Sequence, residues 1–320
     1  MLRTAVVALG GNAFTREHES GGYDEMAANA RVMAEAVDGV RQAGWRVVVV
    51  HGNGPQVGNS AIQQDAGEPV VPRQPLWALG SMTEGLLGSL FCLALREVGG
   101  ERGLDVVSLV THVRVDPADP AFRLPTKPIG PFFSAQAADE LARQKGWQVV
   151  EDAGRGHRRV VPSPAPLEIV EARAIIRLLE QGHIVVAAGG GGIPVAANNG
   201  RLVGVEAVID KDLAAALLGA TVGAQVLVLV TDVDAVMLDF GTPRQRPLTT
   251  VSADEMRMHL RDGQLPEGSM GPKVRACLQF LDAGGGCAVI TRPRLAPRVL
   301  SGHAAAGTRI VSRLADRGAA

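Results

Sequence analysis

Cysteine is scarce in this sequence, and neither sign of charge is in excess. The three cysteines, Cys92, Cys277 and Cys287, lie among apolar residues without C-x-x-C spacing, which argues against disulfides and a zinc site. The seven histidines are not grouped at metal-ligand spacing, so no protein-bound transition metal is expected. The 32 basic and 33 acidic residues give a net charge of -1, which indicates no basic field for nucleic acid or an anionic membrane.

Long apolar runs are also missing. The apolar stretch at the N-terminus is too short for the core of a secretory signal and lacks a small-residue cleavage site. No continuous run approaches about 18 apolar residues, the length that a membrane-spanning helix needs. We therefore expect a cytoplasmic protein that binds neither membrane nor nucleic acid.

Lysine is the rarest charged residue. Of the 32 basic residues, 28 are arginines and only four are lysines. Lys145 belongs to an amphipathic helical pattern, on whose solvated side a lysine is ordinary. Lys127, Lys211 and Lys273 instead stand beside residues typical of turns and helix starts. A compact ammonium on a flexible stem suits contact with a moving phosphate, although chance survival in an arginine-rich chain is the alternative explanation.

Short β-rich runs alternate with helical patterns along most of the chain. This alternation is typical of parallel strands joined by crossover helices, and the nearly continuous apolar character of the runs predicts strands buried on both faces. The sequence thus predicts an α/β fold with a doubly wound sheet. The predicted strands are 4–9, 46–51, 105–110, 183–188, 225–231, 286–291 and, more weakly, 308–311, and the predicted helices include 24–43, 78–98, 167–181, 212–218, 252–262 and 272–283.

The stretch from about 112 to 166 interrupts this rhythm. It is rich in proline and holds one clear helical pattern, at 134–147. No linker-like change of composition and no repeat divides the rest of the chain. We therefore expect an inserted subdomain attached to one continuous sheet.

Three predicted strands end in glycine-rich turns, at 6–12, 47–59 and 185–195. In an open parallel sheet such turns gather at the carboxyl edge, where ligands bind. Glycines let backbone N–H groups approach an anion, and Asn12 and Asn53 can add side-chain amide donors. A tight strand-to-helix connection explains any one turn equally well, but three together favour a phosphate site.

The glycine turns fit neither of the two commonest nucleotide fingerprints. Val57 stands where G-x-G-x-x-G requires its third glycine, and no G-x-x-x-x-G-K-[ST] occurs. The sequence therefore disfavours a dinucleotide-binding fold and a P-loop.

Two of the unusual lysines stand at predicted helix starts. Asp210 is a candidate N-cap, and it could also hold Lys211 or engage a metal. Lysine at a helix N-terminus opposes the macrodipole at a cost of about 0.3–1 kcal/mol, so contact with a ligand explains Lys211 better than capping. The motif at 268–273 opens another helix with proline near its first turn, which places Lys273 at a second positive helix end.

Phosphoryl transfer depends mainly on positioning and on cations around the transferred group, and glycine turns with lysines supply both. A polar turn follows the predicted strand at 225–231. Its position and polarity suit contact with a nucleoside, although such turns are also common without a ligand. The residues concerned are Thr231, Asp232 and Val233.

Together these motifs resemble those of the carbamate kinases, a branch of the amino acid kinase family. The resemblance runs nearly from end to end of the chain. HGNGPQVGN and TKPIGPF in one chain separate this branch from relatives that phosphorylate N-acetylglutamate, aspartate or uridylate. The motifs are ALGGNA (8–13), HGNGPQVGN (51–59), DPADPAF (116–122), PTKPIGPFF (125–133), RRVVPSP (158–164), AAGGGGIPV (187–195), EAVIDKDLA (206–214), LVTDVD (229–234) and GSMGPKV (268–274).

The resemblance implies a three-layer α/β/α sandwich with a mainly parallel central sheet of about eight strands and an inserted, protruding subdomain. It implies one domain over 1–320, with an acceptor-binding lobe at about 1–225 that contains a lid at about 112–166. The lobe at about 226–320 would bind nucleotide. It further implies a homodimer that reversibly converts ATP and carbamate to ADP and carbamoyl phosphate with Mg²⁺, run in cells toward ATP.

The resemblance also implies roles for residues at matching positions. Lys211 should bridge the donor and acceptor phosphates, Asp210 should organise Lys211, and Lys127 should reach in from the subdomain. The residues expected to hold carbamoyl phosphate and the transferred group are Gly10, Gly11, Asn12, Gly52, Asn53 and Gly54. Those expected to contact the nucleotide are Lys273, Gly271, Thr231, Asp232 and Val233.

A few positions depart from the family pattern. Trp77 replaces a usual Asp, Thr83-Glu84 a usual Ser-Gln, His112 a usual Gln and Ala165 a usual Lys. Two alternatives to a carbamate kinase stay open, the first of them because of Trp77, Thr83 and Glu84. One is a kinase of the same fold that acts on another small carboxylate or phosphonate, and the other is a nucleotide-sensing homologue without turnover.

Overall fold

An eight-stranded sheet forms the centre of the protein, in the order β15-β17-β16-β12-β1-β2-β9-β3. The computed structural model describes residues 3–10, 13–16, 18–152, 154–266, 268–303 and 306–313. Every neighbouring pair is parallel except β16 and β17. The strands are β1 (Arg3–Leu9), β2 (Trp45–His51), β3 (Val106–Ser108), β9 (Ile184–Val186), β12 (Val226–Val230), β15 (Thr250–Ser252), β16 (Cys287–Thr291) and β17 (Thr308–Val311).

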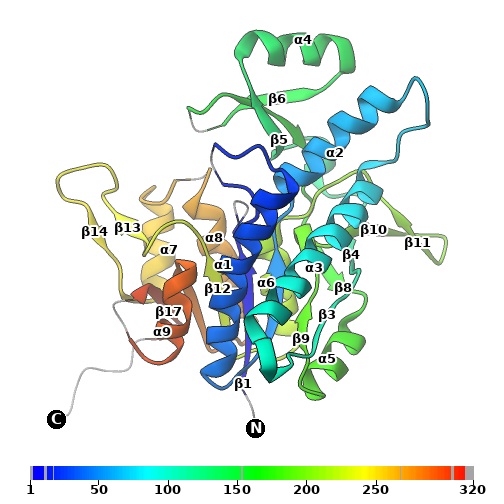
Figure 1. The fold of residues 1–320 in the computed structure, drawn as a ribbon. Coiled ribbons are helices and arrows are strands. Elements are labelled where there is room, and N and C mark those ends of the chain that lie inside the picture. Colours follow the sequence, from blue (N-terminus) through cyan, green and yellow to red (C-terminus); the bar gives the residue numbers. More distant parts are fainter. Residues whose placement is uncertain are drawn as a thin grey trace, which may run out of the picture.

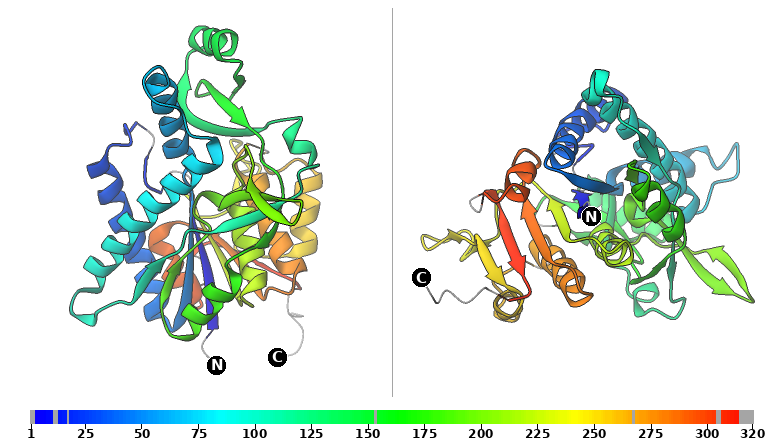
Figure 2. Two further views of the ribbon diagram at one scale, coloured as in Figure 1. Left: turned by 90° about the vertical axis from the view of Figure 1, so that its right-hand side faces the viewer. Right: turned by 90° about the horizontal axis from the view of Figure 1, so that it is seen from below.

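Helices cover both faces of this sheet (Figures 1 and 2). Alternate residues of β1 divide between two apolar cores, because successive strand side chains point to opposite faces. Val6 and Ala8 pack with α5 (Ala172–Glu180), α6 (Lys211–Thr221), α7 (Ala253–Arg261) and α8 (Met270–Asp282). Ala5, Val7 and Leu9 pack with α1 (Tyr23–Gln42), α3 (Leu76–Gly99) and α9 (Ala296–Leu300). The predicted three-layer α/β/α fold with about eight mainly parallel strands is confirmed.

A separate three-stranded sheet, β5-β7-β6, stands above the carboxyl ends of the central strands (Figure 1). Its strands are β5 (Lys127–Phe133), β6 (Gln148–Glu151) and β7 (His157–Val161), and α4 (Ala135–Lys145) packs against them. α2 (Gly54–Gly67) supports this unit from below. A methyl group on Gly58 of α2 would lie 2.0 Å from the backbone of Gly130, so the two backbones touch where the unit joins the body.

Smaller elements flank the main sheet. A four-stranded sheet, β11-β10-β4-β8, contains β4 (His112–Val115), β8 (Pro166–Ile169), β10 (Ile193–Asn198) and β11 (Arg201–Gly204). A two-stranded sheet pairs β13 (Met237–Leu238) with β14 (Arg246–Pro247). The short 3₁₀ helices are η1 (Gly100–Arg102), η2 (Pro120–Phe122), η3 (Gly189–Gly191) and η4 (Pro293–Leu295).

The predicted elements agree with the structure except at one helix, but several elements of the structure were not predicted. All seven predicted runs form strands of the central sheet, but the short edge strand β15 was not predicted. The glycine-rich stretch 47–59 contains the start of a helix, α2, with Pro55 in its first turn, where a missing N–H costs nothing. The predicted helix 167–181 is wrong at its start, because 166–169 pair with β4 as β8 and α5 begins only at Ala172.

By length and composition, α3 is apolar and long enough to cross a membrane, although the sequence contains no continuous apolar run of that length. More than half of its apolar window is buried inside the protein, where Leu87, Phe91 and Leu95 are fully enclosed. That burial is typical of the core helix of a globular protein.

Candidate active site

The glycine turns meet at the carboxyl edge of the central sheet, beneath the β5-β7-β6 unit (Figure 1). Gly10 follows β1, and a methyl group there would lie 3.0 Å from the carbonyl oxygen of Val230 on β12. A methyl group on Gly54 would lie 4.0 Å from the carbonyl oxygen of Pro128 on β5. The expected substrate residues Gly11 and Asn12 lie outside the described residues.

The third glycine turn touches both the second turn and the segment before α6. Gly190 and Gly191 have φ angles of 70° and 98°, which favour glycine. A methyl group on Gly190 would lie 2.2 Å from Nδ2 of Asn53, and one on Gly191 would lie 2.3 Å from the carbonyl oxygen of Ile209. The second and third of the turns predicted to converge therefore lie in direct contact.

Asn53 is buried at the N-terminus of α2, next to Gly52 and Gly54. Its side chain makes no capping bond to the helix. Nδ2 of Asn53 instead donates to Oγ1 of Thr83 at 2.9 Å. One of the two amide hydrogens of Asn53 is thus held by α3.

Lys211 and Lys273 share one carboxylate, that of Asp212. Nζ of Lys211 donates to Oδ1 of Asp212 at 2.5 Å, and Nζ of Lys273 donates to Oδ2 at 3.0 Å. Lys211 and Asp212 are both buried in the first turn of α6, and Lys273 lies in the first turns of α8. Two helix N-termini and two ammonium groups are therefore directed at one place.

Asp210 joins the β5-β7-β6 unit to this cluster. As predicted, it caps α6, because Oδ1 accepts the backbone N–H groups of Asp212 at 2.8 Å and Leu213 at 3.3 Å. Its other oxygen, Oδ2, accepts from Nζ of Lys127 at 2.5 Å. The hydrogen-bonded partner of Lys211 is Asp212. Asp210 acts on Lys211 through its charge, which raises the pKa of that lysine against burial.

Burial and charge oppose each other in this cluster. Burial lowers the pKa of Lys211 to about 8, although attraction to Asp212 works against it. Burial alone would lower the pKa of Lys273, but Asp212 outweighs it and raises that pKa. Burial alone would raise the pKa of Asp212, but Lys211 and Lys273 hold it well below its ordinary value. Lys127 likewise keeps the pKa of Asp210 low against burial.

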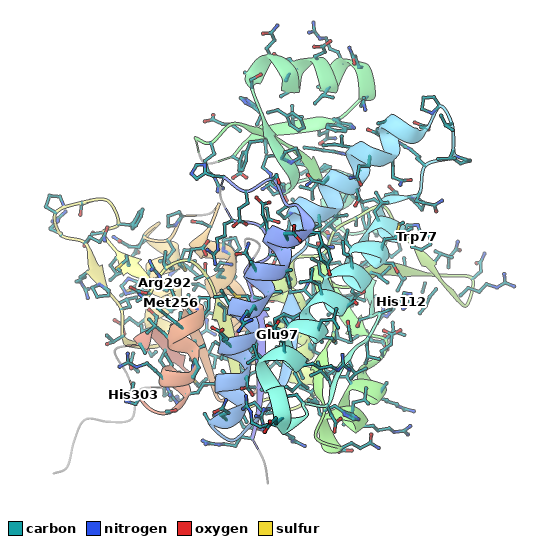
Figure 3. The ribbon with its side chains drawn as sticks, in the orientation of Figure 1. Trp77, Glu97, His112, Met256, Arg292 and His303 are labelled. Carbon is teal, nitrogen blue, oxygen red and sulfur yellow. The ribbon has the colours of Figure 1, made fainter. Side chains whose placement is uncertain are left out.

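The loop after β12 is bound to the end of β16, and the start of α8 carries Lys273 of the cluster. The backbone N–H of Thr231 donates to the carbonyl of Thr291 at 2.9 Å, which fixes the start of the loop that carries Asp232 and Val233. Gly271 lies in the first turn of α8, and its N–H donates to the carbonyl of Pro266. Arg292 follows β16 on the side of the molecule away from Trp77 and His112 (Figure 3).

The departures from the family pattern occupy two different settings. Trp77 packs on Gly204 of the β10–β11 hairpin, where a methyl group would lie 2.3 Å from the indole ring. His112 contacts Glu171 through its backbone N–H at 2.7 Å and through Nδ1 at 2.9 Å. Thr83 and Glu84, in contrast, are buried against the glycine turns.

Two features of the site were not found from the sequence. Asp212 did not stand out in the sequence, because acidic residues are common in the first turn of a helix. Its contact with Lys273 joins residues 61 positions apart. Lys145 is exposed, as its helical pattern predicts, and its Nζ also donates to Asp65 of α2 at 3.0 Å and lies 5.5 Å from the Trp147 ring centre. Neither contact has a local sequence signal.

Two helix N-termini, three lysines and adjoining glycine turns lie together at this edge of the sheet, and comparison with known proteins places the chain in a family. The profile described as the amino acid kinase family matches residues 3–292. The chain belongs to the amino acid kinase family.

Several similar proteins are carbamate kinases. The carbamate kinase of Pyrococcus horikoshii is 45% identical over 314 residues, which cover 97% of this chain and 99% of that protein. The structure of carbamate kinase from Giardia lamblia bound to citric acid matches with a TM-score of 0.92 at 41% identity, over 97% of this chain and 98% of that one. The same enzyme bound to AMP-PNP matches with a TM-score of 0.87 over the same shares. The resemblance drawn from the motifs is confirmed.

Proposed function

We propose that this protein is a carbamate kinase that catalyses the reversible reaction of ATP and carbamate to ADP and carbamoyl phosphate. The observation that carries the proposal is the convergence of Lys127, Lys211 and Lys273, through Asp210 and Asp212, beside the glycine turns. The similarity to carbamate kinases over nearly the whole chain supports the choice of acceptor.

The charges in the cluster suit phosphoryl transfer. Three ammonium groups and two carboxylates leave one net positive charge, and each ammonium has further N–H donors for phosphate oxygens. The two aspartates keep the lysines in place before a substrate arrives. Such preorganised cations stabilise the charge that spreads over the transferred group in the transition state.

The two ends of the site divide the substrates between them. We assign the acceptor and the transferred phosphoryl group to Gly10, Gly11, Asn12, Gly52, Asn53 and Gly54 in the N-terminal lobe. Thr231, Asp232, Val233, Gly271 and Lys273 then contact the nucleotide in the C-terminal lobe. Lys211 lies at the boundary and bridges both phosphates, while Lys127 reaches it from the subdomain. Direct contact between Gly10 and the strand that precedes Thr231 supports this arrangement.

Mg²⁺ is proposed to enter with the nucleotide and to neutralise phosphate charge there. Both carboxylates of the cluster already accept hydrogen bonds from lysines. Among the described residues, no group of three or more His, Cys, Asp or Glu side chains could hold a metal. Phosphate oxygens and waters, which Mg²⁺ commonly keeps as ligands, fit such a site.

The protein is proposed to act as a cytoplasmic homodimer and to run toward ATP. One face of α3 carries exposed apolar side chains, Met82 (58%), Leu86 (44%) and Leu93 (58%). A second copy of the chain could cover this face. Measurement of the mass in solution, with Leu86→Glu as a variant, tests it: the dimer is expected to dissociate in the variant, and a wild-type monomer would refute it.

A second candidate is a kinase of the same fold that uses another small carboxylate or phosphonate. It is favoured by the placement of Thr83 and Glu84 against the acceptor-side turns. A panel of small acyl phosphates tested for ATP formation separates the two candidates. Carbamoyl phosphate is expected to be the best donor, and a markedly better one among the others would favour the second candidate.

The direct test incubates the purified protein with carbamoyl phosphate, ADP and Mg²⁺ and measures the ATP formed. A parallel reaction without protein controls for spontaneous decomposition of carbamoyl phosphate. ATP formation well above this control is expected. Tight ADP binding without ATP formation would instead indicate a nucleotide-sensing homologue.

A further inference from the structure

Two neighbouring residues of α3 each hold a different glycine turn. Thr83 and Glu84 are 2% and 1% exposed, so both polar side chains are enclosed by protein. Buried polar groups are costly unless they are hydrogen-bonded, and both side chains here are. Their partners lie on the turns that follow β2 and β9.

Thr83 connects α3 to the second turn. Its hydroxyl donates to the carbonyl of Leu79 at 2.8 Å, one turn earlier in the helix. This leaves the lone pairs of Oγ1 for Nδ2 of Asn53, which lies at 2.9 Å. The hydroxyl thereby determines which way the buried amide of Asn53 faces.

Glu84 connects α3 to the third turn and to the start of β4. Oε1 accepts the backbone N–H of Gly189 at 2.9 Å, and Oε2 accepts that of Thr111 at 3.2 Å. The N–H of Gly189 is therefore used inside the protein rather than by a ligand, in contrast to the simple expectation for a glycine turn.

The enclosure around Gly189 leaves no room for a side chain. A methyl group on Gly189 would lie 2.4 Å from Nε2 of His51 and 2.9 Å from Cγ of Glu84. Gly190, the next residue, lies against the Asn53 amide that Thr83 holds. Thr83, Asn53, Gly190 and Glu84 thus form a closed set of contacts across two turns.

We propose that Thr83 and Glu84 are positioning residues that lock the second and third glycine turns into one acceptor-binding unit. The proposal rests on the proposed function, because the acceptor side is defined by it. Loss of either side chain is expected to loosen Asn53 and its neighbours. Binding of carbamoyl phosphate should then weaken, while binding of ADP at the far side of the cluster should not.

The ionisation of Glu84 is compatible with a neighbouring phosphate. Burial raises the pKa of Glu84 to about 8, and the nearby charge of Glu171 adds to the effect. Burial also lowers the pKa of His51 to about 4. Both side chains that flank Gly189 are therefore mainly neutral at pH 7, and neither repels nor neutralises a bound anion.

The test compares Thr83→Val, which keeps the shape of the side chain but removes the acceptor, with Thr83→Ser, which keeps the hydroxyl. We expect Thr83→Val to raise the KM for carbamoyl phosphate about tenfold, the effect of losing about 1.4 kcal/mol. The KM for ADP should change less than about twofold in the same assay. Thr83→Ser is expected to restore most of the loss.

Glu84 is tested by the same comparison of the KM for carbamoyl phosphate with the KM for ADP. Glu84→Leu removes both acceptor oxygens, whereas Glu84→Gln keeps one for the Gly189 N–H and should rescue part of the effect. Gly85→Ala is a matched control on α3, because a methyl group there meets nothing within 4 Å. Melting temperatures identify any variant that fails to fold, in which case the Thr83 pair decides.

The outcomes of this test separate the inference from the proposed function. If the wild type forms no ATP from carbamoyl phosphate, the proposed function fails. If the wild type is active, and folded Thr83→Val and Glu84→Leu keep an unchanged KM for carbamoyl phosphate or raise both KM values equally, the positioning role is wrong.

Discussion

The two halves of the site are held together by opposite kinds of chemistry. On the side that we assign to the acceptor, mainly neutral groups of α3 fix the glycine turns, and Glu84 is the buried example. On the other side, three lysines are held by Asp210 and Asp212, all within a charged cluster. Neutral hydrogen bonds fix the shape of the turns without adding charge. The ion pairs instead hold lysines whose remaining N–H groups can bind a phosphate. The comparison predicts that changes in the charged half alter turnover and changes in the neutral half alter acceptor binding.

The largest effect is expected for Lys211→Ala. Loss of an ammonium that acts mainly in the transition state should lower kcat by about two to three orders of magnitude. ADP binding, measured by calorimetry, and the melting temperature should stay near wild-type values. If the variant turns over like the wild type, Lys211 does not stabilise the transition state as proposed.

A large effect on stability is also expected for a substitution where the β5-β7-β6 unit packs on α2. In Gly58→Ala the new methyl group would lie 2.0 Å from the backbone of Gly130, so the contact must open. We expect a loss of about 1–3 kcal/mol in unfolding free energy and a higher KM for carbamoyl phosphate, because β5 also carries Lys127.

Gly80→Ala is the matched control for Gly58→Ala. Gly80 lies in α3, and a methyl group there meets nothing within 4 Å. The helix should gain up to about 1 kcal/mol. If Gly58→Ala and Gly80→Ala lose similar unfolding free energy, the close contact between Gly58 and Gly130 is not the cause of the loss.

A moderate effect on stability is expected from the titration of Glu84, the buried carboxyl group that binds the third glycine turn. The folded protein keeps the Glu84 proton up to a pKa of about 8, against 4.5 for a free side chain. Wild-type stability from this group is therefore present below about pH 4.5 and is lost progressively as the pH rises to about 8. Glu84→Gln has no proton to lose, so it should gain relative to the wild type by at most about 1.4 kcal/mol per pH unit in that window.

Thermal unfolding of both proteins at pH 5 and pH 8 measures this difference. Glu171 and His51 face Glu84 in both proteins, so their own titration cancels from the comparison. A gap between the two melting temperatures that does not change with pH would show that Glu84 is ionised in the folded protein.

The smallest effect is expected for Lys145→Ala. The ammonium pairs with Asp65 at the edge of the subdomain, where its side chain is 34% exposed. Such pairs contribute about 0–1 kcal/mol. Turnover should be unchanged, and unfolding should shift only slightly. A clear loss of turnover would mean that the contact with α2 controls how the subdomain sits over the site.

Most of the fold could be predicted because local patterns and tertiary packing agree. The apolar runs of β1, β2 and β12 are buried on both faces, as their composition indicates. β8 and α2 were missed because partners far along the chain decide them: β4 pairs with β8, and the backbone of Gly130 packs on α2. No local signal reports either partner.

The site could be predicted in its residue types but not in its pairings. Lys127, Lys211 and Lys273 stood out because lysine is rare here, and the structure brings them together through two aspartates. Which aspartate holds which lysine depends on the packing of α6 against α8. The link from Thr83 to Asn53 similarly joins a helix face to a turn 30 positions earlier.

The pH dependence of kcat/KM for ATP formation, compared between wild type and Asp212→Asn, tests the central role of the shared carboxylate most directly. The wild-type rate should fall as the pH rises through about 8, because Lys211 loses its proton there. In Asp212→Asn the attraction that opposes burial is gone, so this fall should begin about one pH unit lower or more. A fall at the same pH in both proteins would contradict the account.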